Sequence, residues 1–366
     1  MTADDYLALI EGERRGLAAG ALRAGLSALA LAYRVGLEAY LLPYGLGVRR
    51  RARLPVPVVC VGNLTSGGTG KTPMAQLVCE TLQAAGIRPA VLSRGYRGEH
   101  EHGAAVVATP ERIEMSAAQA GDEAHLLASL LPGVPVLAGK DRRVTGRLAC
   151  ERFAPGAVVL DDGMQFYQLH RDLDIVLIDA RRPFHNGWTL PRGLLREPPS
   201  HLRRAGLVVM THADRIAPKE RDALACRLQS LAPRAAHVRA WYRAAGLRSL
   251  AGPRALQPAE WLAGRRVATF CALASPQGFE EQVLREGAQI VHAERLPDHA
   301  TATLRDLERL IEIACAGGAE AVVVSEKDAA KLPPLGRPIP FLSLAVRHVV
   351  DKPDTFRDVL LRALRQ

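Results

Sequence analysis

Residues 56–73 combine an apolar run with a glycine-rich turn, a spacing that suits the binding of phosphate. The β-branched residues of the run are typical of a strand buried on both faces. Gly67, Gly68 and Gly70 then allow the backbone to turn tightly and to approach an anion closely. A helix is predicted from Met74 to Ala84, so backbone N–H groups of the turn and of the helix N-terminus face a bound phosphate. The stretch therefore predicts a nucleotide-binding loop.

Lys71 and Thr72 end this turn with side chains that act on nucleotide phosphates. A lysine here reaches the β- and γ-phosphates, and the threonine hydroxyl ligates Mg²⁺. The strict pattern has glycine where this chain has Thr65, and we expect Gly67 and Gly68 to compensate. A glycine turn with a lysine is often only a loop, but the flanking strand and helix favour phosphate binding. The predicted nucleotide-binding residues are Thr65, Ser66, Gly67, Gly68, Thr69, Gly70, Lys71 and Thr72.

Asp161 and Asp162 directly follow the apolar run Ala157–Leu160. A carboxylate at the end of such a strand holds Mg²⁺, or its bound water, beside Thr72. A strand that ends in aspartate is common by itself. Together with the glycine turn it predicts a nucleoside triphosphate site.

Strand-like runs alternate with helical segments along the chain. Further buried strands are predicted at Pro89–Ser93, Ala104–Ala108, Val134–Ala138, Ile175–Asp179 and Leu207–Thr211. The alternation predicts an α/β fold of the P-loop type, with a mostly parallel sheet, helices on both faces, and ligands at the carboxyl ends of the strands. The predicted division is an N-terminal helical arm at 1–54, a P-loop core at 55–235, a linker with a hairpin at 236–265 and a smaller C-terminal α/β lobe at 266–366.

The segment Arg181–Pro199 has no clear periodicity and lies between two predicted strands. A loop of this length inside a compact domain is usually functional or a lid. It carries arginines at 181, 182, 192 and 196. They predict contact with phosphate or a sugar lipid, and the alternative is a solvated basic loop.

The arm turns strongly apolar from Gly16 to Gly47, interrupted by Arg23, Arg34 and Glu38. Because a membrane span needs about 20 mostly apolar residues, a helix lying in the membrane interface fits better than an ordinary span. Arginines at 49, 50, 51 and 53 follow, where anionic lipid attracts them. The alternative is a helix packed on the protein's own core. A secretory signal is not expected, because the polar start lacks a basic, apolar and cleavable order.

The composition is that of a globular protein, with 48% hydrophobic and 23% charged residues. The net charge of +10 favours anionic partners, and an arginine-rich proteome is the neutral explanation. Nucleic acid is not expected, because the basic residues are dispersed and lack interleaved aromatics. The six cysteines are far apart and indicate buried thiols in a reducing compartment rather than a metal site.

Taken together, these motifs resemble the tetraacyldisaccharide 4′-kinase family of lipid A biosynthesis. The matching runs are Val61–Asn63, Gly67–Pro73, Leu92–Gly98, Gly121–Glu123, Gly139–Arg142, Leu160–Gln165, Asn186–Gly187, Leu190–Pro191, Gly193, Leu195–Pro198, Pro297–His299 and Ser325–Leu332. They cover nearly the whole chain in order and spacing. Two positions depart from the family pattern, since Phe166 and Ala300 stand where histidines are usual.

The resemblance implies transfer of the ATP γ-phosphate to the 4′-hydroxyl of a lipid-linked glucosamine disaccharide 1-phosphate. It also implies dependence on Mg²⁺, a location at the cytoplasmic face of the bacterial inner membrane, and a monotopic arm that admits the acylated substrate. No obligate protein partner is expected.

The attacking sugar hydroxyl must lose a proton, so a carboxylate or histidine within hydrogen-bond reach is needed. The resemblance points to Asp122 as this base, although an aspartate at the start of a helix is also a common N-cap. His299, preceded by Asp298, is predicted to orient or share the proton. The alternative is a surface histidine in a turn.

Arginines suit phosphate oxygens through their fork geometry. The candidates for substrate or phosphate contact are Arg94, Tyr96, Arg142, Gln165, Arg196 and Asp298, and the candidate metal ligands are Thr72, Asp161, Asp162 and Glu197. Two other functions stay open at this point, a P-loop kinase of a soluble small molecule and a nucleotide switch. A switch needs segments that respond to the γ-phosphate but no acceptor pocket.

Overall fold

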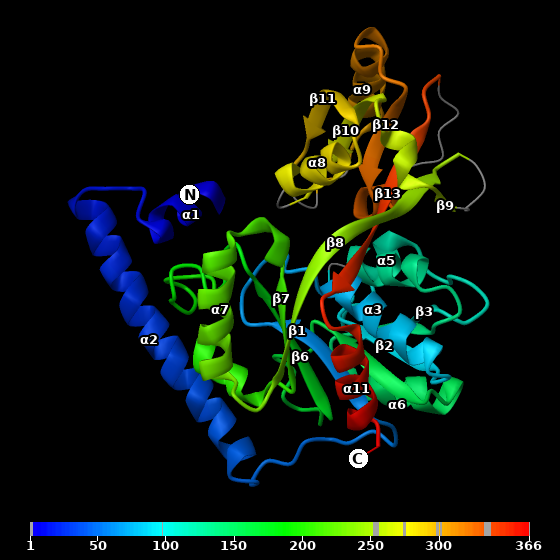
Figure 1. Cartoon of the computed structure of the whole chain (residues 1–366). Coiled ribbons are helices and arrows are strands. Elements are labelled where there is room, and N and C mark those ends of the chain that lie inside the picture. Colours follow the sequence, from blue (N-terminus) through cyan, green and yellow to red (C-terminus); the bar gives the residue numbers. More distant parts are fainter. Residues whose placement is uncertain are drawn as a thin grey trace. The chain divides into compact units, whose positions relative to one another are not determined.

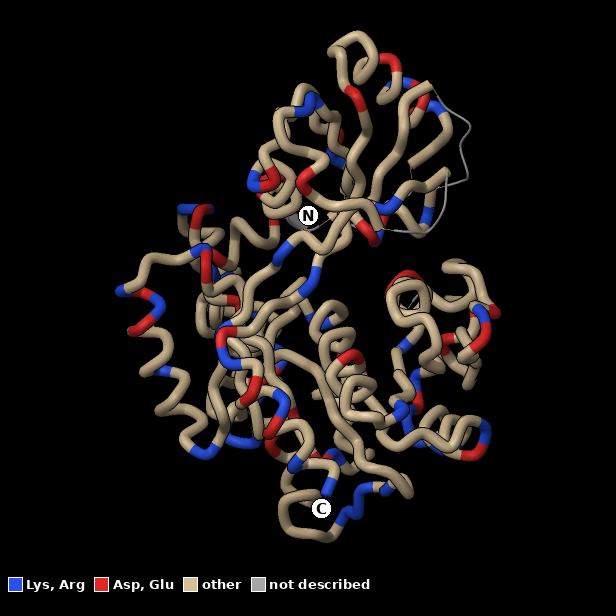
Figure 2. Tube along the Cα trace, turned by 45° about the vertical axis from the view of Figure 1, so that its right-hand side comes forward, with Lys and Arg blue, Asp and Glu red and all other residues tan. Residues whose placement is uncertain are grey.

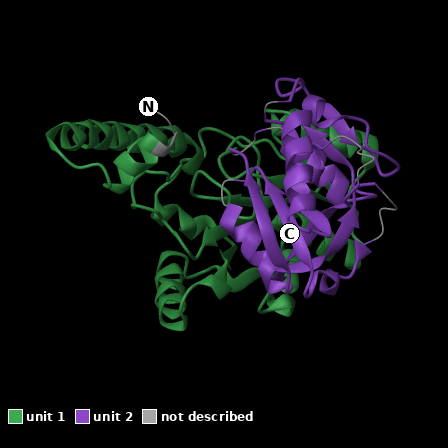
Figure 3. Ribbon diagram, turned by 90° about the horizontal axis from the view of Figure 1, so that it is seen from above, with its two compact units in different colours: residues 1–94, 139–241, 350–366 green, residues 95–138, 242–349 purple. Residues whose placement is uncertain are grey.

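The computed structural model describes residues 3–96, 98–251, 256–273, 276–297, 300, 302–332 and 338–365. Backbone contacts divide the chain into two compact units, coloured separately in Figure 3. Unit 1 comprises residues 1–94, 139–241 and 350–366, and unit 2 comprises residues 95–138 and 242–349. Neither unit is one continuous stretch of the sequence.

Unit 1 is built on a parallel sheet with the strand order β8-β7-β6-β1-β5-β2. The strands are β1 (Val58–Asn63), β2 (Pro89–Ser93), β5 (Ala157–Asp161), β6 (Leu173–Asp179), β7 (Leu207–Thr211) and the first part of β8 (Ala236–Ser249). Every residue of β1 and of β5 is buried, as in strands covered on both faces. The predicted mostly parallel α/β sheet is confirmed, and its apolar composition explains why it forms.

Helices follow the strands of unit 1, as Figure 1 shows. They are α3 (Lys71–Ala84), α6 (Arg142–Phe153), α7 (Pro218–Leu231) and α11 (Pro353–Ala363), with the 3₁₀ turns η1 (Pro199–Arg204) and η2 (Ala213–Arg215). Helix α3 contacts β1 and β5 and packs with α11. Helix α6 begins after Asp141, whose carboxylate accepts the backbone N–H of Arg143 at 2.9 Å.

The N-terminal arm of unit 1 consists of α1 (Ala3–Glu11) and α2 (Leu17–Gly45). In Figure 1, α2 is the long blue helix, and most of its length stands apart from the sheet of unit 1. By length and composition α2 could cross a membrane, with a mean hydropathy of 1.2 in its most apolar window. Its exposed apolar side chains include Leu22, Leu29, Leu31, Val35 and Leu42.

Unit 2 contains the sheet β11-β10-β12-β13-β8, with β9 paired to β8. Its strands are β9 (Leu256–Gln257), β10 (Arg266–Cys271), β11 (Gln289–Arg295), β12 (Ala321–Ser325), β13 (Phe341–Val350) and the rest of β8. Its helices include α8 (Pro276–Arg285), α9 (Leu304–Ala316), α10 (Glu326–Ala329) and the 3₁₀ turn η3 (Ala259–Leu262). Alternate residues of β10 and β12 enter two separate apolar clusters, one with α8 and one with α9. Because side chains alternate along a strand, α8 and α9 cover opposite faces of this sheet.

Residues 95–138 of unit 2 form a smaller part with four elements. These are β3 (Ala105–Ala108), α4 (Ala117–Ala120), α5 (Asp122–Leu130) and β4 (Val136–Ala138). Strands β3 and β4 are antiparallel, and α5 contacts both strands and α10. This packing positions the first residue of α5, the predicted base.

The units divide the chain differently from the predicted division. Residues 95–138, expected in the P-loop core, belong to unit 2, where α5 packs against α10. Residues 350–366, expected in the C-terminal lobe, return to unit 1, where α11 packs on α3. The expected linker at 236–265 includes β8, which runs through both units. Packing partners that lie far apart in the sequence decide these memberships, so order along the chain does not reveal them.

Candidate active site

The glycine-rich turn joins the carboxyl end of β1 to the first residue of α3. Gly67 has a φ of 120° and Gly70 a φ of 86°, conformations that other residues rarely adopt. The buried side chain of Asn63 donates hydrogen bonds to the hydroxyl oxygen of Thr69 at 2.8 Å and of Thr65 at 3.3 Å. Thr65 therefore anchors the turn from within, at the position where the strict pattern has glycine.

A charged cluster lies at the start of α3. Lys71 Nζ is 3.7 Å from Asp162 Oδ2, and Arg196 Nη1 donates to both Asp162 oxygens at 3.0 Å. Burial alone would raise the pKa of Asp162, but Lys71, Arg196 and Arg142 together hold that pKa below its ordinary value. The carboxylate stays ionised and keeps the lysine and Arg196 close to each other.

Asp161 and Thr72 lie at the same edge of the sheet. Asp161 ends β5, is 2% exposed and pairs in register with Val61 of β1. Among the described residues, no group of three or more His, Cys, Asp or Glu side chains could hold a metal ion. Carboxylate and hydroxyl oxygens nevertheless suit Mg²⁺, which commonly takes its other ligands from water and nucleotide phosphates. These two residues therefore fit a Mg²⁺ that arrives with the nucleotide.

Glu197, a predicted metal ligand, is fully buried among hydrogen-bond donors. Its carboxylate accepts from Tyr167 Oη at 2.5 Å, Gln165 Nε2 at 2.8 Å and Arg204 Nη2 at 2.8 Å, and lies 2.8 Å from His201 Nδ1. Burial by itself would raise the pKa of Glu197, but the hydrogen bonds from His201, Arg204 and Tyr167 hold that pKa well below its ordinary value. These donors occupy the carboxylate, so Glu197 anchors the loop that carries it.

The loop at 181–199 lies against the glycine-rich turn. The backbone N–H of Ser66 donates to the carbonyl of Leu194 at 2.7 Å, and that of Arg196 donates to the carbonyl of Leu64 at 2.7 Å. Gln165 adds a side-chain link, since its Nε2 donates to the carbonyl of Asn63 at 3.1 Å and its Oε1 accepts from Arg196 at 3.1 Å. The second half of the loop is thus part of the wall of the phosphate site.

Arg142 begins α6 and is buried, with 4% of its surface exposed. Its Nη1 donates to the carbonyls of Gly139 at 3.2 Å and Lys140 at 3.1 Å, while its Nε has no hydrogen-bond partner within the part of the chain that the structure describes. The guanidinium lies 5.9 Å from the centre of the Phe166 ring. Burial lowers the pKa of Arg142. Phe166 therefore supplies an aromatic face for this cation.

Asp122 lies in unit 2 as the first residue of α5, where a negative charge suits the helix dipole. The N-cap is Gly121, without a side-chain hydrogen bond, so the alternative of an Asp122 cap is not observed. Lys331 Nζ is 2.5 Å from Asp122 Oδ2, and the two side chains are 10% and 29% exposed. A Cβ atom at Gly121 would lie 2.7 Å from the carbonyl oxygen of Tyr96. A glycine at this position therefore lets the backbone at 121 pass close to the backbone at 96.

The remaining predicted residues are scattered. Arg94 is exposed directly after β2, and Tyr96 is also exposed. Asp298 and His299 lie outside the described residues. The sequence reasoning missed Asn63, Tyr167, His201, Arg204 and Lys331. A polar residue inside a buried strand could have drawn attention to Asn63. Tyr167 and Lys331 have partners in distant segments, so nothing local marks them. His201 and Arg204 follow Glu197 by four and seven residues, in a stretch whose sequence shows no clear periodicity.

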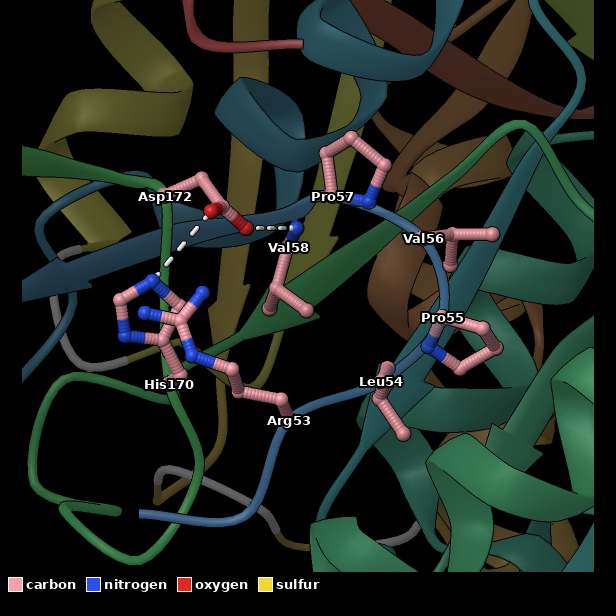
Figure 4. Close-up of a pocket in the computed structure, with 8 residues that line it drawn as sticks. All are labelled: Arg53, Leu54, Pro55, Val56, Pro57, Val58, His170 and Asp172. Atoms are coloured by element: carbon pink, nitrogen blue, oxygen red, sulfur yellow. Dashed lines mark hydrogen bonds and ion pairs between the residues drawn. The ribbon is translucent and has the colours of Figure 1, made fainter. Parts of the chain in front are cut away.

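A hollow of about 190 Å³ lies at the amino end of β1, shown in Figure 4. It is lined by Arg53, Leu54, Pro55, Val56, Pro57, Val58, His170 and Asp172. Asp172 accepts the backbone N–H of Val58 at 2.7 Å and lies 3.3 Å from His170 Nε2. These polar groups hold the start of the strand, at the edge of the sheet opposite the glycine-rich turn.

A parallel sheet with a glycine-rich turn, a lysine at the start of the following helix and aspartates at the carboxyl edge is typical of nucleotide-binding P-loop proteins. The family described as tetraacyldisaccharide-1-P 4′-kinase matches residues 22–365, and the chain belongs to this family.

Two relatives and one solved structure illustrate the similarity. The tetraacyldisaccharide 4′-kinase of Pelobacter propionicus is 42% identical over 330 residues, covering 89% of this chain and 88% of that protein. The one from Syntrophus aciditrophicus is 38% identical over 353 residues, covering 93% of this chain and 92% of that protein. A crystal structure of LpxK from Aquifex aeolicus in complex with ATP superposes with a TM-score of 0.74 at 27% identity, covering 94% of this chain and 99% of that one.

Proposed function

We propose that this chain transfers the γ-phosphate of ATP to the 4′-hydroxyl of a tetraacyldisaccharide 1-phosphate in lipid A biosynthesis. The observation that carries the proposal is the cluster of Lys71, Asp162 and Arg196 beside the glycine-rich turn, in a chain of this kinase family. Phosphoryl transfer asks a protein mainly for alignment and for neutralisation of charge. Lys71 and Arg196, held near each other by the ionised Asp162, supply both the alignment and the positive charge.

The residues of unit 1 have separate roles in this proposal. The amides of the turn and Lys71 bind the β- and γ-phosphate oxygens, and Arg196 and Arg142 face the transferred group. Mg²⁺, when bound with ATP to Thr72 and Asp161, supplies further positive charge at these oxygens. Because side-chain donors occupy Glu197, we assign that residue to holding Gln165 and the loop rather than to the metal.

The acceptor chemistry is assigned to unit 2. The 4′-oxygen attacks the γ-phosphorus, the bond to the β,γ-bridging oxygen breaks, ADP leaves, and the hydroxyl proton passes to the Asp122 carboxylate. Lys331 holds one oxygen of that carboxylate at 2.5 Å. We keep His299 as the residue that orients or shares the proton, with Asp298 beside it, and Arg94 and Tyr96 as contacts to substrate.

The arm fits an acylated substrate at a membrane surface. Helix α2 exposes Leu29, Val35 and Leu42. Its middle part contacts the rest of unit 1 through Ala30, Tyr33 and Glu38. A helix tied in this way suits a monotopic position in the interface at the cytoplasmic face of the inner membrane better than an isolated span. Lys and Arg are spread along the chain and interspersed with Asp and Glu (Figure 2), so the proposal relies on the apolar arm rather than on one basic patch.

The test is incubation of the purified full chain with γ-labelled ATP, Mg²⁺ and an acylated glucosamine disaccharide 1-phosphate dispersed in detergent. We expect label on the 4′-oxygen, identified by phosphorus NMR of the product. Label on a soluble sugar alcohol instead would favour a kinase of a small molecule. Release of labelled inorganic phosphate alone would favour a nucleotide switch.

A further inference from the structure

The carboxyl-terminal half of α2 is connected to the phosphate site by a continuous chain of polar contacts within unit 1. Glu38 Oε1 lies 2.9 Å from His201 Nε2, and His201 Nδ1 lies 2.8 Å from Glu197 Oε2. The imidazole is buried, with 5% of its side chain exposed, between two carboxylates. Since carboxylates only accept hydrogen bonds, the ring bridges both when both of its nitrogens carry hydrogens.

From Glu197 the polar contacts continue to Lys71, the lysine of the glycine-rich turn. Glu197 Oε1 accepts from Gln165 at 2.8 Å, and Gln165 accepts from Arg196 at 3.1 Å. Arg196 then donates to Asp162, which pairs with Lys71. Every link is a direct side-chain contact, so a shift of the bridging imidazole displaces groups that hold the cations of the site.

A second contact reaches the same arginine directly. Tyr33 Oη on α2 donates to the backbone carbonyl of Arg196 at 2.8 Å. One turn earlier, Thr189 Oγ1 donates to the carbonyl of Ala30 at 3.3 Å. The loop at 181–199 is therefore held between the arm and the glycine-rich turn, and both of its neighbours contact it close to Arg196.

We propose that Tyr33, Glu38 and His201 are positioning residues, through which the arm sets the placement of Arg196 and Lys71 at the phosphate site. The arm then has a role in catalysis besides binding lipid. When an acylated substrate binds α2, a shift of Tyr33 or Glu38 also shifts Arg196 and Lys71, which face the phosphate being transferred. This inference rests on the proposed function. It makes the arm a part of the active site rather than only an anchor.

The test uses the full chain with the variants Tyr33→Phe, Glu38→Gln and the double variant, and Arg34→Gln as the control. Arg34 is exposed on the same helix, so this control changes the charge of the arm without removing either of the two contacts. Transfer from ATP to the acylated disaccharide is measured in detergent, where attachment to a bilayer is not required. Flotation with vesicles of phosphatidylethanolamine and phosphatidylglycerol reports membrane binding separately.

We expect the double variant to lose about tenfold in kcat, as misplacement of a charge-stabilising group does, with unchanged flotation and melting temperature. Arg34→Gln should keep its kcat. A cycle with His201→Asn should be non-additive, so that adding Glu38→Gln to it costs little more. Normal kcat in the double variant, or additive losses in the cycle, would overturn the coupling. Absence of transfer by the wild-type chain would instead refute the proposed function.

Discussion

Each unit contains a lysine paired with an aspartate, and the surroundings of the aspartate differ between the two pairs. In unit 1 the Lys71–Asp162 distance is 3.7 Å, and the carboxylate also receives two hydrogen bonds from Arg196. In unit 2 the Lys331–Asp122 distance is 2.5 Å, and the aspartate sits at the start of α5. The first carboxylate is surrounded by cations that keep it ionised, whereas in the second one oxygen lies against Lys331.

This difference indicates which residue of each pair takes part in the reaction. A carboxylate held by several cations is a poor proton acceptor but a good support for a lysine that faces phosphate. A carboxylate that is 29% exposed can be reached by a substrate hydroxyl and can take up its proton. We therefore expect Lys71 in unit 1 to bind the phosphate and Asp122 in unit 2 to accept the proton. Asp162 and Lys331 hold these two side chains in place.

The largest expected effect comes from removing the acting lysine. Lys71→Ala should lower kcat/KM by about 10³–10⁵, the range for losing a cation that stabilises a transferring phosphoryl group. The melting temperature should stay close to that of the wild type. Lys219→Ala on α7, an exposed lysine far along the chain, is the matched control. Near-normal turnover in a folded Lys71→Ala enzyme would reject the assignment of the loop.

Removing the acting aspartate comes next. Asp122→Asn should lower kcat by about 10²–10⁴, the range for loss of a general base, with little change in the KM for ATP. Glu312→Gln on the exposed side of α9 controls for loss of a carboxylate in unit 2. If KM rose while kcat stayed constant, Asp122 would bind substrate instead of accepting its proton.

Lys71 and Asp122 were candidates from the sequence, but neither of the assembled environments around them was predictable. The glycine turn, β2 and β7 were predictable because their signals are local, namely apolar runs and glycines at fixed spacing. The partner Lys331 lies more than two hundred residues from Asp122, and no local pattern links them. Glu197 illustrates the same limit, since its donors Tyr167 and Gln165 come from another segment and reach it only through folding.

The supporting lysine of unit 2 should matter less than the aspartate that it holds. Lys331→Met should lower kcat by about tenfold, because Asp122 loses the contact that fixes one of its oxygens. Lys331→Arg keeps the charge and should recover most of the activity. The two rates are compared at saturating ATP. Equal losses in the Met and Arg variants would mean that the packing of the lysine stem, rather than its charge, is what the site needs.

Loss of the supporting aspartate of unit 1 should show in the stability of the fold, with a defined dependence on pH. Because the folded protein holds the pKa of Asp162 below its ordinary value of 3.8, the ionised side chain stabilises the fold above that pH. This contribution is lost as pH falls through the lower pKa of the folded state. Urea unfolding should therefore give a difference of about 1–2 kcal/mol between the wild type and Asp162→Asn near pH 7, shrinking below about pH 4.

A difference that grew on acidification would mean that Asp162 is held protonated in the folded protein, since only a raised pKa gives that sign. The pair in unit 1 would then lose its fixed negative charge, and Lys71 and Arg196 would have no reason to lie close together. Arg196→Gln provides the complementary measurement, because it removes the donor of two of the contacts and should weaken the same pH dependence. Unchanged pH dependence in that variant would leave Lys71 and Arg142 as the groups that keep Asp162 ionised.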